Sequence, residues 1–205
     1  MDALENSSTT LLPTGKSTRP KSITLFVTAL LFALLAGSVA AQAQAAPLVV
    51  TAINAGRFYG DPNPAFTGTI TGLRSGDTIT AIYSTVADPT SPVGDYLIIP
   101  TLVDPDNKLS NYVVIINNGT LTVTPAPLSV VADDATRAVG QPNPAFTGTI
   151  SGVKNGEDIT ATNDSPATVG SEAGTYPIVP TLKDASGQIG NYVVSISKGT
   201  LTITP

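Results

Sequence analysis

Residues 62–70 read Pro-Asn-Pro-Ala-Phe-Thr-Gly-Thr-Ile, and residues 142–150 repeat the same nine residues in the same order. At this offset (142 − 62 = 80), the chain from Pro47 aligns with the chain from Pro127 without a gap, and about half of the aligned positions are identical. A long ungapped internal match indicates repeated structural units. The sequence therefore predicts two tandem modules, module 1 at residues 47–125 and module 2 at residues 126–205, after a separate segment at residues 1–46.

Each module is predicted to be all-β. The clearest strand is residues 121–124, where apolar side chains alternate with Thr, which is the period of a half-buried strand. Asn118-Gly119 before it indicates a hairpin turn, and the prolines of residues 60–64 predict a loop, since proline cannot donate to a strand ladder. Strands are expected in module 1 at residues 48–52, 65–71, 78–84, 96–102, 112–116 and 120–124. Because only a short proline-containing segment follows residue 124, the last strand is expected to run almost directly into module 2.

The composition argues against catalysis. The chain contains no Cys and no His, which excludes disulfides, thiolate nucleophiles and catalytic Ser-His-Asp or Cys-His arrangements. The formal net charge is −5, and only 12% of residues are charged. Since an acidic surface repels phosphate backbones, nucleic acid is not expected as a partner. We therefore expect a protein that is not an enzyme and carries no cofactor.

The N-terminal segment has the order of a secretory signal peptide. A basic cluster at Lys16, Arg19 and Lys21 precedes an uncharged apolar run at residues 23–36, and small residues follow at 37–45. This order, with Ala-x-Ala sites ending at Ala43 and Ala45, predicts cleavage before Gln44 or Ala46. An uncleaved membrane anchor is the alternative, and it would be the chain's only membrane contact. In both cases the modules are expected to be exported, to a secreted or cell-surface location.

Several spaced elements of the two modules resemble a known family. They are Pro47-Leu48 at the start, Tyr59-Gly60 before residues 63–66, a Gly-x-Tyr, an Asn-Tyr and a closing Gly-Thr-Leu-Thr-Val-Thr-Pro. Together they resemble the bacterial MBG domain of the YGX type over residues 47–205. The resemblance implies small β modules, β-grasp-like or Ig-like, found in tandem in surface and secreted proteins, many of them adhesin-like. Module 2 departs from the pattern at Val139, where module 1 has Tyr59.

Carboxylates are the remaining candidates for chemistry. Asp77 and Glu157 occupy matched positions, as do Asp104 and Asp184, and all four are expected to serve turns by bonding nearby backbone. We therefore expect no catalytic residue. Residues Asp104, Asp106 and Asn107 offer oxygen ligands within a short stretch and form a weak calcium candidate, but a solvated turn is the preferred interpretation.

Aromatic side chains provide the candidate ligand site. A glycan site uses exposed aromatic platforms, and three aromatics of module 1 have no aromatic counterpart in module 2: Phe58, Tyr59 and Tyr83. By contrast, Tyr96, Tyr112, Tyr176 and Tyr192 occur in both modules and are expected to be core or sheet residues. We expect the hydroxyls of Tyr96 and Tyr176 to bond nearby backbone, as in a tyrosine corner, and truncation of Tyr59 to be much less harmful than truncation of these two.

The sequence thus favours a non-catalytic, exported β-repeat protein with a structural role, as a stalk or spacer, or an adhesive role at the cell surface. The alternative is a glycan-binding, lectin-like module that uses the loop aromatics of module 1. The partner is expected to be extracellular, either a glycan or a protein.

Overall fold

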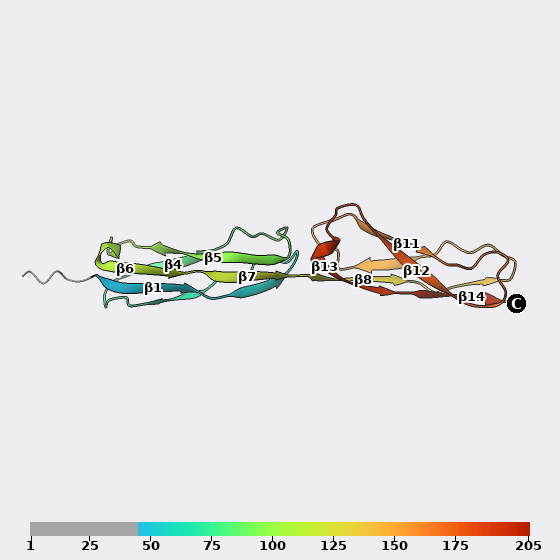
Figure 1. The fold of residues 1–205 in the computed structure, drawn as a ribbon, viewed down its shortest axis with the longest axis horizontal. Helices are drawn as coiled ribbons and strands as arrows, with labels where there is room; N and C mark the ends of the chain where they lie inside the picture. Colours follow the sequence, from blue (N-terminus) through green and yellow to red (C-terminus); the bar gives the residue numbers. More distant parts are fainter. Residues whose placement is uncertain (1–44) are drawn as a thin grey trace, which may run out of the picture. The chain divides into compact units, whose positions relative to one another are not determined.

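Seven strands form each module of the computed structural model, which describes residues 45–205 (Figure 1). The predicted signal peptide lies outside the described residues except for Ala45 and Ala46, the second of which begins the first strand. In the part of the chain that the structure describes, no helix is both long and apolar enough to cross a membrane.

Module 1 contains one more strand than the sequence predicts. Its strands are β1 (Ala46–Ala52), β2 (Ala55–Phe58), β3 (Gly68–Thr71), β4 (Thr80–Ser84), β5 (Gly94–Val103), β6 (Tyr112–Asn117) and β7 (Gly119–Thr124). The extra strand is β2, which the hydrophobic pattern does not reveal because it buries an arginine, Arg57, in place of an apolar side chain. The loop predicted at residues 60–64 is confirmed.

Module 2 repeats these strands in the same order. They are β8 (Ala126–Ala132), β9 (Ala135–Ala138), β10 (Gly148–Ser151), β11 (Ile159–Asp164), β12 (Gly174–Asp184), β13 (Tyr192–Ser197) and β14 (Gly199–Thr204). A single 3-10 turn precedes β6 and β13, at Leu109–Asn111 and Ile189–Asn191.

The strands of each module form two sheets. In module 1 the orders are β3-β1-β6 and β2-β7-β5-β4, and in module 2 they are β10-β8-β13 and β11-β12-β14-β9. In module 1, β1 runs parallel to β6 and β2 runs parallel to β7, while the remaining pairs are antiparallel. The described residues include no α-helix to cover a sheet. The all-β prediction is confirmed.

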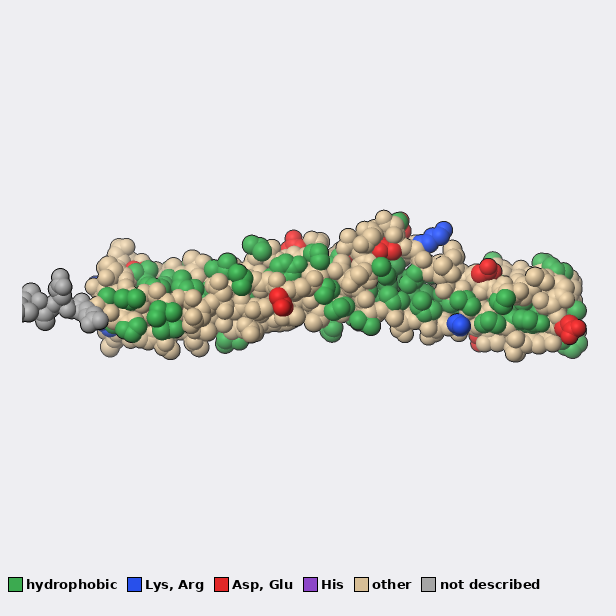
Figure 2. Space-filling model, in the orientation of Figure 1, with side chains coloured by type: hydrophobic (Ala, Val, Ile, Leu, Met, Phe, Trp, Pro, Cys, Tyr) green, Lys and Arg blue, Asp and Glu red, His purple; other side chains and the backbone are tan. Residues whose placement is uncertain are grey.

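The core lies between the sheets and follows the alternation seen in the sequence. In β1 the inward side chains are Leu48, Val50 and Ala52, and in β7 they are Leu121 and Val123, all at most 5% exposed. Alternate residues of a strand point to opposite faces, so the threonines between them reach the surface. On the visible face, acidic and basic side chains are few and scattered among hydrophobic and other side chains (Figure 2).

The hairpin predicted at Asn118-Gly119 is wrong. The chain passes directly from β6 to β7, and these strands pair with different partners, β6 with β1 and β7 with β2 and β5. A Cβ on Gly119 would lie 3.0 Å from the carbonyl oxygen of Ile53 and 3.1 Å from that of Ala52. The glycine is thus needed because two chain segments, β1–β2 and β6–β7, approach closely where both change sheets.

The connection between the modules is a single residue. Strand β7 ends at Thr124 and β8 begins at Ala126, with Pro125 between them, which confirms the short connection predicted from the sequence. Ala126 is fully buried. One core cluster includes side chains of both modules: Ala52, Tyr59, Ala87, Ile98, Leu121, Val123, Ala126, Leu128, Ile159 and Tyr192.

Candidate functional site

Two loops at the end of module 1 are held together by a buried arginine. Arg57, at the centre of β2, is 8% exposed and donates from Nε to Asn63 Oδ1 (2.7 Å) and from Nη1 to the carbonyl of Phe58 (3.1 Å). Its Nη2 donates to the carbonyl of Asp88 in the second loop. Asn63 in turn donates to the carbonyl of Ala87 (2.7 Å). Because a guanidinium is a planar fork of donors, one side chain fixes both loops.

Module 2 builds the same arrangement from matched residues. Arg137 is also 8% exposed and donates to Asn143 Oδ1 (2.7 Å) and to the carbonyls of Ala138 (3.1 Å) and Thr168. Sequence reasoning missed both arginines. The available signal was the retention of an arginine at an offset of 80 residues (137 − 57 = 80), ahead of an Asn-Pro, in a chain with few charged residues.

The loops fixed by Arg57 carry Tyr59 to module 2. The expectation that Tyr59 is an exposed aromatic is wrong, since its side chain is 2% exposed. Its ring meets the ring of Tyr192 edge to face, with centroids 5.6 Å apart and planes at 80°. Its hydroxyl donates to Glu157 Oε1, while the Tyr192 hydroxyl donates to Glu157 Oε2 at 2.6 Å. One carboxylate of module 2 therefore accepts a tyrosine hydroxyl from each module.

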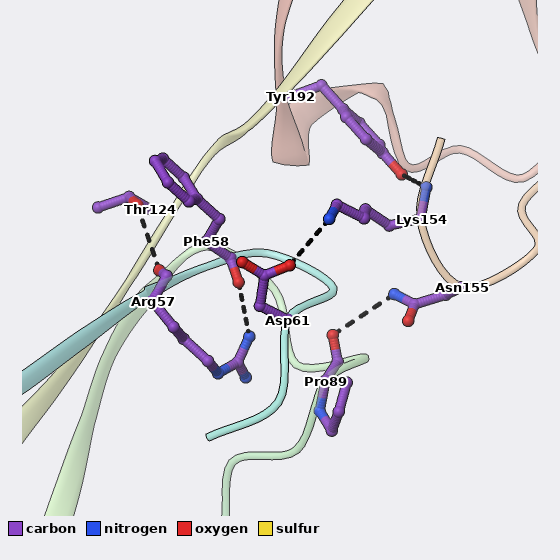
Figure 3. Close-up of polar contacts among 8 residues, drawn as sticks. All are labelled: Arg57, Phe58, Asp61, Pro89, Thr124, Lys154, Asn155 and Tyr192. Carbon is purple, nitrogen blue, oxygen red and sulfur yellow. Dashed lines mark hydrogen bonds and ion pairs between the residues drawn. The ribbon is translucent and has the colours of Figure 1, made fainter. Parts of the chain in front are cut away.

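An ion pair lies beside the tyrosines. Lys154 Nζ is 2.8 Å from Asp61 Oδ1, and both side chains are about one third exposed (31% and 38%) (Figure 3). The backbone N–H of Lys154 donates to the Tyr192 hydroxyl at 2.9 Å. Asn155 donates to the carbonyl of Pro89 at 3.4 Å, in the second of the two loops (Figure 3).

Gly60 allows the two modules to approach. Its φ of +80° lies in the left-handed region, which favours glycine. In addition, a Cβ at this position would overlap the aliphatic stem of Lys154, including a contact of 2.8 Å with Cδ. Gly140, the matched residue of module 2, has a φ of +77°, but a Cβ there would meet nothing within 4 Å. Of these two matched glycines, Gly60 alone is required by a contact with the other module.

Asn191 adds a further polar contact. It is 8% exposed, accepts from the backbone N–H of Val93 at 3.0 Å, and donates to Gln188 Oε1 at 2.9 Å. We call the Tyr59, Gly60 and Asp61 segment the inserting loop. The receiving face of module 2 comprises Lys154, Asn155, Glu157, Asn191 and Tyr192.

The surroundings of the two tyrosines keep their hydroxyls protonated. Burial, followed by the hydrogen bond to Glu157, raises the pKa of Tyr192 to about 12 and also raises the pKa of Tyr59 above its usual 10.0. Both groups therefore stay protonated, and able to donate, at alkaline pH values where an ordinary tyrosine ionises. The two tyrosines and Glu157 thus hold module 1 against module 2.

The other two aromatic candidates, Phe58 and Tyr83, lie outside the contact between the modules that buries Tyr59. Phe58, at the end of β2, is 51% exposed, while Tyr83, in β4, is partly buried with its ring against Gly68 of β3. Tyr59 points into the junction instead. The structure thus leaves Phe58 as the exposed member of the three aromatics expected to bind a glycan.

The calcium candidate forms a turn, as the preferred interpretation predicts. Asp104 accepts from the backbone N–H groups of Lys108 (3.0 Å) and Leu109 (2.8 Å), and these bonds lower its pKa. Asp106 accepts from the hydroxyl of Thr78 at 2.6 Å, and Asn107 has a left-handed φ of 54°. Within residues 45–205, no group of three or more acidic, His or Cys side chains is placed to hold a metal ion.

The shared tyrosines lie in strands, as expected. Tyr96 donates to the carbonyl of Pro92 at 2.8 Å and Tyr176 to that of Glu172 at 3.2 Å, which confirms the predicted hydroxyl-to-backbone bonds. The expected role of Asp77 and Glu157 is wrong, because both accept tyrosine hydroxyls, Asp77 from Tyr112 and Glu157 from two tyrosines.

Comparison with known proteins identifies the class of these modules. A family model described as MBG domain (YGX type) matches residues 48–122 and again residues 128–202. The chain belongs to this family, as two tandem MBG domains. In module 1 the Tyr-Gly-x of the family's name is the inserting loop, Tyr59-Gly60-Asp61. A comparison with curated proteins finds no match.

Proposed function

We propose that the chain is an exported, non-catalytic spacer whose two modules are coupled stiffly through the inserting loop and the receiving face. The burial of Tyr59 against Tyr192 and Glu157 of module 2 carries this proposal. Domains of one chain move relative to each other by default unless a substantial interface restrains them. Here the one-residue connection and the shared core cluster both oppose such motion.

A coupled pair of modules suits a structural role. A spacer must keep a fixed distance between its ends. A flexible joint between the modules would shorten the mean end-to-end distance and widen its distribution. The polar contacts of the junction fix the rotation of one module against the other, because a hydroxyl–carboxylate bond and an ion pair have narrow geometries.

Spin-label distances test the coupling. Thr80 and Thr160 are exposed, occupy matched strand positions in the two modules, and lie outside the inserting loop and the receiving face. Replacing both with Cys gives two unique labelling sites, since the chain has no Cys. We expect a narrow distance distribution from pulsed electron paramagnetic resonance. Gly60→Ala should broaden it, while Gly140→Ala, with the same backbone strain but an open surrounding, should leave it narrow. A broad distribution in the unsubstituted junction would contradict the proposal.

The exported location is the second part of the proposal. The predicted cleavage sites precede Gln44 and Ala46, and β1 begins at Ala46, so cleavage at either site leaves every described strand complete. Sequencing the N-terminus of the protein recovered from outside the cell should give Gln44 or Ala46. Recovery of a protein that begins at Met1 would favour the uncleaved anchor instead.

A further inference from the structure

Module 1 carries its own copy of the receiving face. At an offset of 80 residues, the receiving face of module 2 corresponds to Arg74, Ser75, Asp77, Asn111 and Tyr112. In the part of the chain that the structure describes, no inserting loop is docked on this set.

The internal geometry of the two receiving faces is the same. The backbone N–H of Arg74 donates to the Tyr112 hydroxyl at 3.0 Å, as that of Lys154 does to Tyr192 at 2.9 Å. The Tyr112 hydroxyl donates to Asp77 Oδ2, which leaves Oδ1 of the same carboxylate as an acceptor. Both tyrosines are 7% exposed, Tyr192 with the ring of Tyr59 packed against it and Tyr112 with the guanidinium of Arg74 over its ring.

The two faces differ where the inserting loop binds. Asn191 is buried under module 1, whereas Asn111 is exposed. Arg74 is exposed and its guanidinium lies over the ring of Tyr112, 5.3 Å from the centroid. In module 2 a ring, that of Tyr59, packs against the matched tyrosine, and the matched cation, Lys154, reaches out to Asp61. The arginine thus covers the tyrosine in the absence of a partner.

We propose that the receiving face of module 1 binds the inserting loop of another MBG module, one whose loop reads Tyr-Gly followed by an acidic residue. The incoming tyrosine packs against Tyr112 and donates to Asp77 Oδ1, and Arg74 moves from the ring to pair with the incoming carboxylate. The occupied junction of this chain supplies each of these contacts between matched residues.

A second copy of this chain does not fit this face. Its own Tyr59 loop is buried in its junction, and the matched loop of module 2 reads Val139-Gly140-Gln141. Valine has no hydroxyl for Asp77, and glutamine has no charge for Arg74. The receiving face therefore discriminates against head-to-tail association of the chain with itself.

A three-module protein tests the inference, which rests on the coupling proposed above. A second copy of residues 46–125 is inserted ahead of Ala46 of the chain, so that its Tyr-Gly-Asp loop precedes module 1 through the same Thr-Pro connection. The control insert is residues 126–205, which ends in the same Thr-Pro but carries Val-Gly-Gln. Labels are placed at the Thr80 position of module 1 and at the matched threonine of the insert. A second label pair, at Thr80 and Thr160, reports on the native junction of the same protein.

With the module 1 insert, we expect the spin-label distance distribution across the new junction to be as narrow as the one across the native junction. The narrow component should be lost with the control insert and with Arg74→Glu in the receiving module. A broad distance distribution across the new junction, together with a narrow one across the native junction, would overturn this inference and leave the proposed coupling intact. Distributions that are equally narrow with both inserts would also overturn it. A broad native junction would instead contradict the proposed coupling.

Discussion

A buried arginine without a carboxylate partner organises each module at the residue scale. Arg57 and Arg137 satisfy their donors with an asparagine and backbone carbonyls. This solution keeps the loops in place with neutral acceptors, which a protein with few charged residues can supply. It also makes the site dependent on the forked shape of guanidinium, because lysine presents a single point of charge.

Arg57→Lys is therefore expected to be destabilising in spite of its conserved charge. The loss of the forked bonds leaves buried acceptors without donors and should lower the free energy of unfolding by about 2–3 kcal/mol. The exposed Arg74→Lys is the matched control and should change it by less than about 0.5 kcal/mol. Urea unfolding of both variants measures the difference. Equal stability of the two variants would show that the loops hold without the fork.

Tyr59 and Phe58 are neighbours with opposite surroundings, 2% and 51% exposed. Tyr59→Ala removes a buried ring and a donor to Glu157, so it should cost about 3 kcal/mol of unfolding free energy. Phe58→Ala should cost less than about 1 kcal/mol, because its ring already contacts water. Thermal or urea unfolding of the two variants measures these costs. A harmless Tyr59→Ala would show that the junction adds nothing to stability.

This expectation reverses the ranking drawn from the sequence, in which Tyr96 and Tyr176 matter far more than Tyr59. Tyr96 and Tyr176 are only partly buried, although their rings pack against the core clusters. A partly exposed ring has less apolar area to lose than a fully buried one.

At the scale of elements, each module depends on a crossing of two chain segments. β1 and β6 pair in one sheet, and their continuations β2 and β7 pair in the other. Module 2 does the same with β8, β13, β9 and β14. Each crossing requires a residue without a side chain, Gly119 in module 1 and Gly199 in module 2.

Gly199→Ala should destabilise module 2. Its Cβ would overlap the carbonyl oxygen of Asp133 and lie 2.9 Å from that of Ala132, neither of which can move without breaking the crossing. We expect a loss of roughly 2–3 kcal/mol, the upper range for overpacking. Gly190→Ala, where a Cβ would meet nothing within 4 Å, is the control and should stay within about 0.5 kcal/mol of the parent. Calorimetry measures the unfolding temperatures of both variants. If these temperatures coincided, the crossing would not require a glycine at position 199.

At the scale of the whole molecule, hydrogen-bonded tyrosine hydroxyls make the free energy of unfolding depend on pH in the alkaline range. The folded pKa of Tyr192 is about 12, above the usual 10.0, and the pKa values of Tyr59 and Tyr112 are also raised. A group whose pKa is raised by folding contributes its stability fully below the unfolded value, and the contribution is lost as pH rises toward the folded value. The free energy of unfolding should therefore fall between about pH 10 and pH 12.

Urea unfolding at a series of pH values measures this fall. Tyr192→Phe removes the largest contributor, so its stability should decline less steeply over the same range, with a residual slope from Tyr59 and Tyr112. Phenolate absorbance of the folded protein should show a tyrosine that ionises near pH 12, and this signal should disappear in the variant. Stability that stays level to pH 12 would contradict the role of these hydroxyls.

The sequence by itself determined the features that depend on neighbouring residues. The internal match revealed two modules, alternation located strands such as β7, and the prolines of residues 60–64 located a loop. Each of these signals acts over a few residues, through side-chain direction or the missing N–H of proline. The hydroxyl bonds of Tyr96 and Tyr176, which span four residues, could be predicted for the same reason.

Only the tertiary structure decided what Tyr59, Gly60 and Gly119 do. Tyr59 meets Glu157 from 98 residues away, and Gly119 faces a backbone segment more than sixty residues earlier in the chain (119 − 53 = 66). No local pattern distinguishes a glycine of a turn from a glycine at a crossing, or an exposed tyrosine from one covered by the next module. The surroundings of these positions are created by distant residues, which come together only when module 1 has folded, for Gly119, or when both modules have folded, for Tyr59 and Gly60.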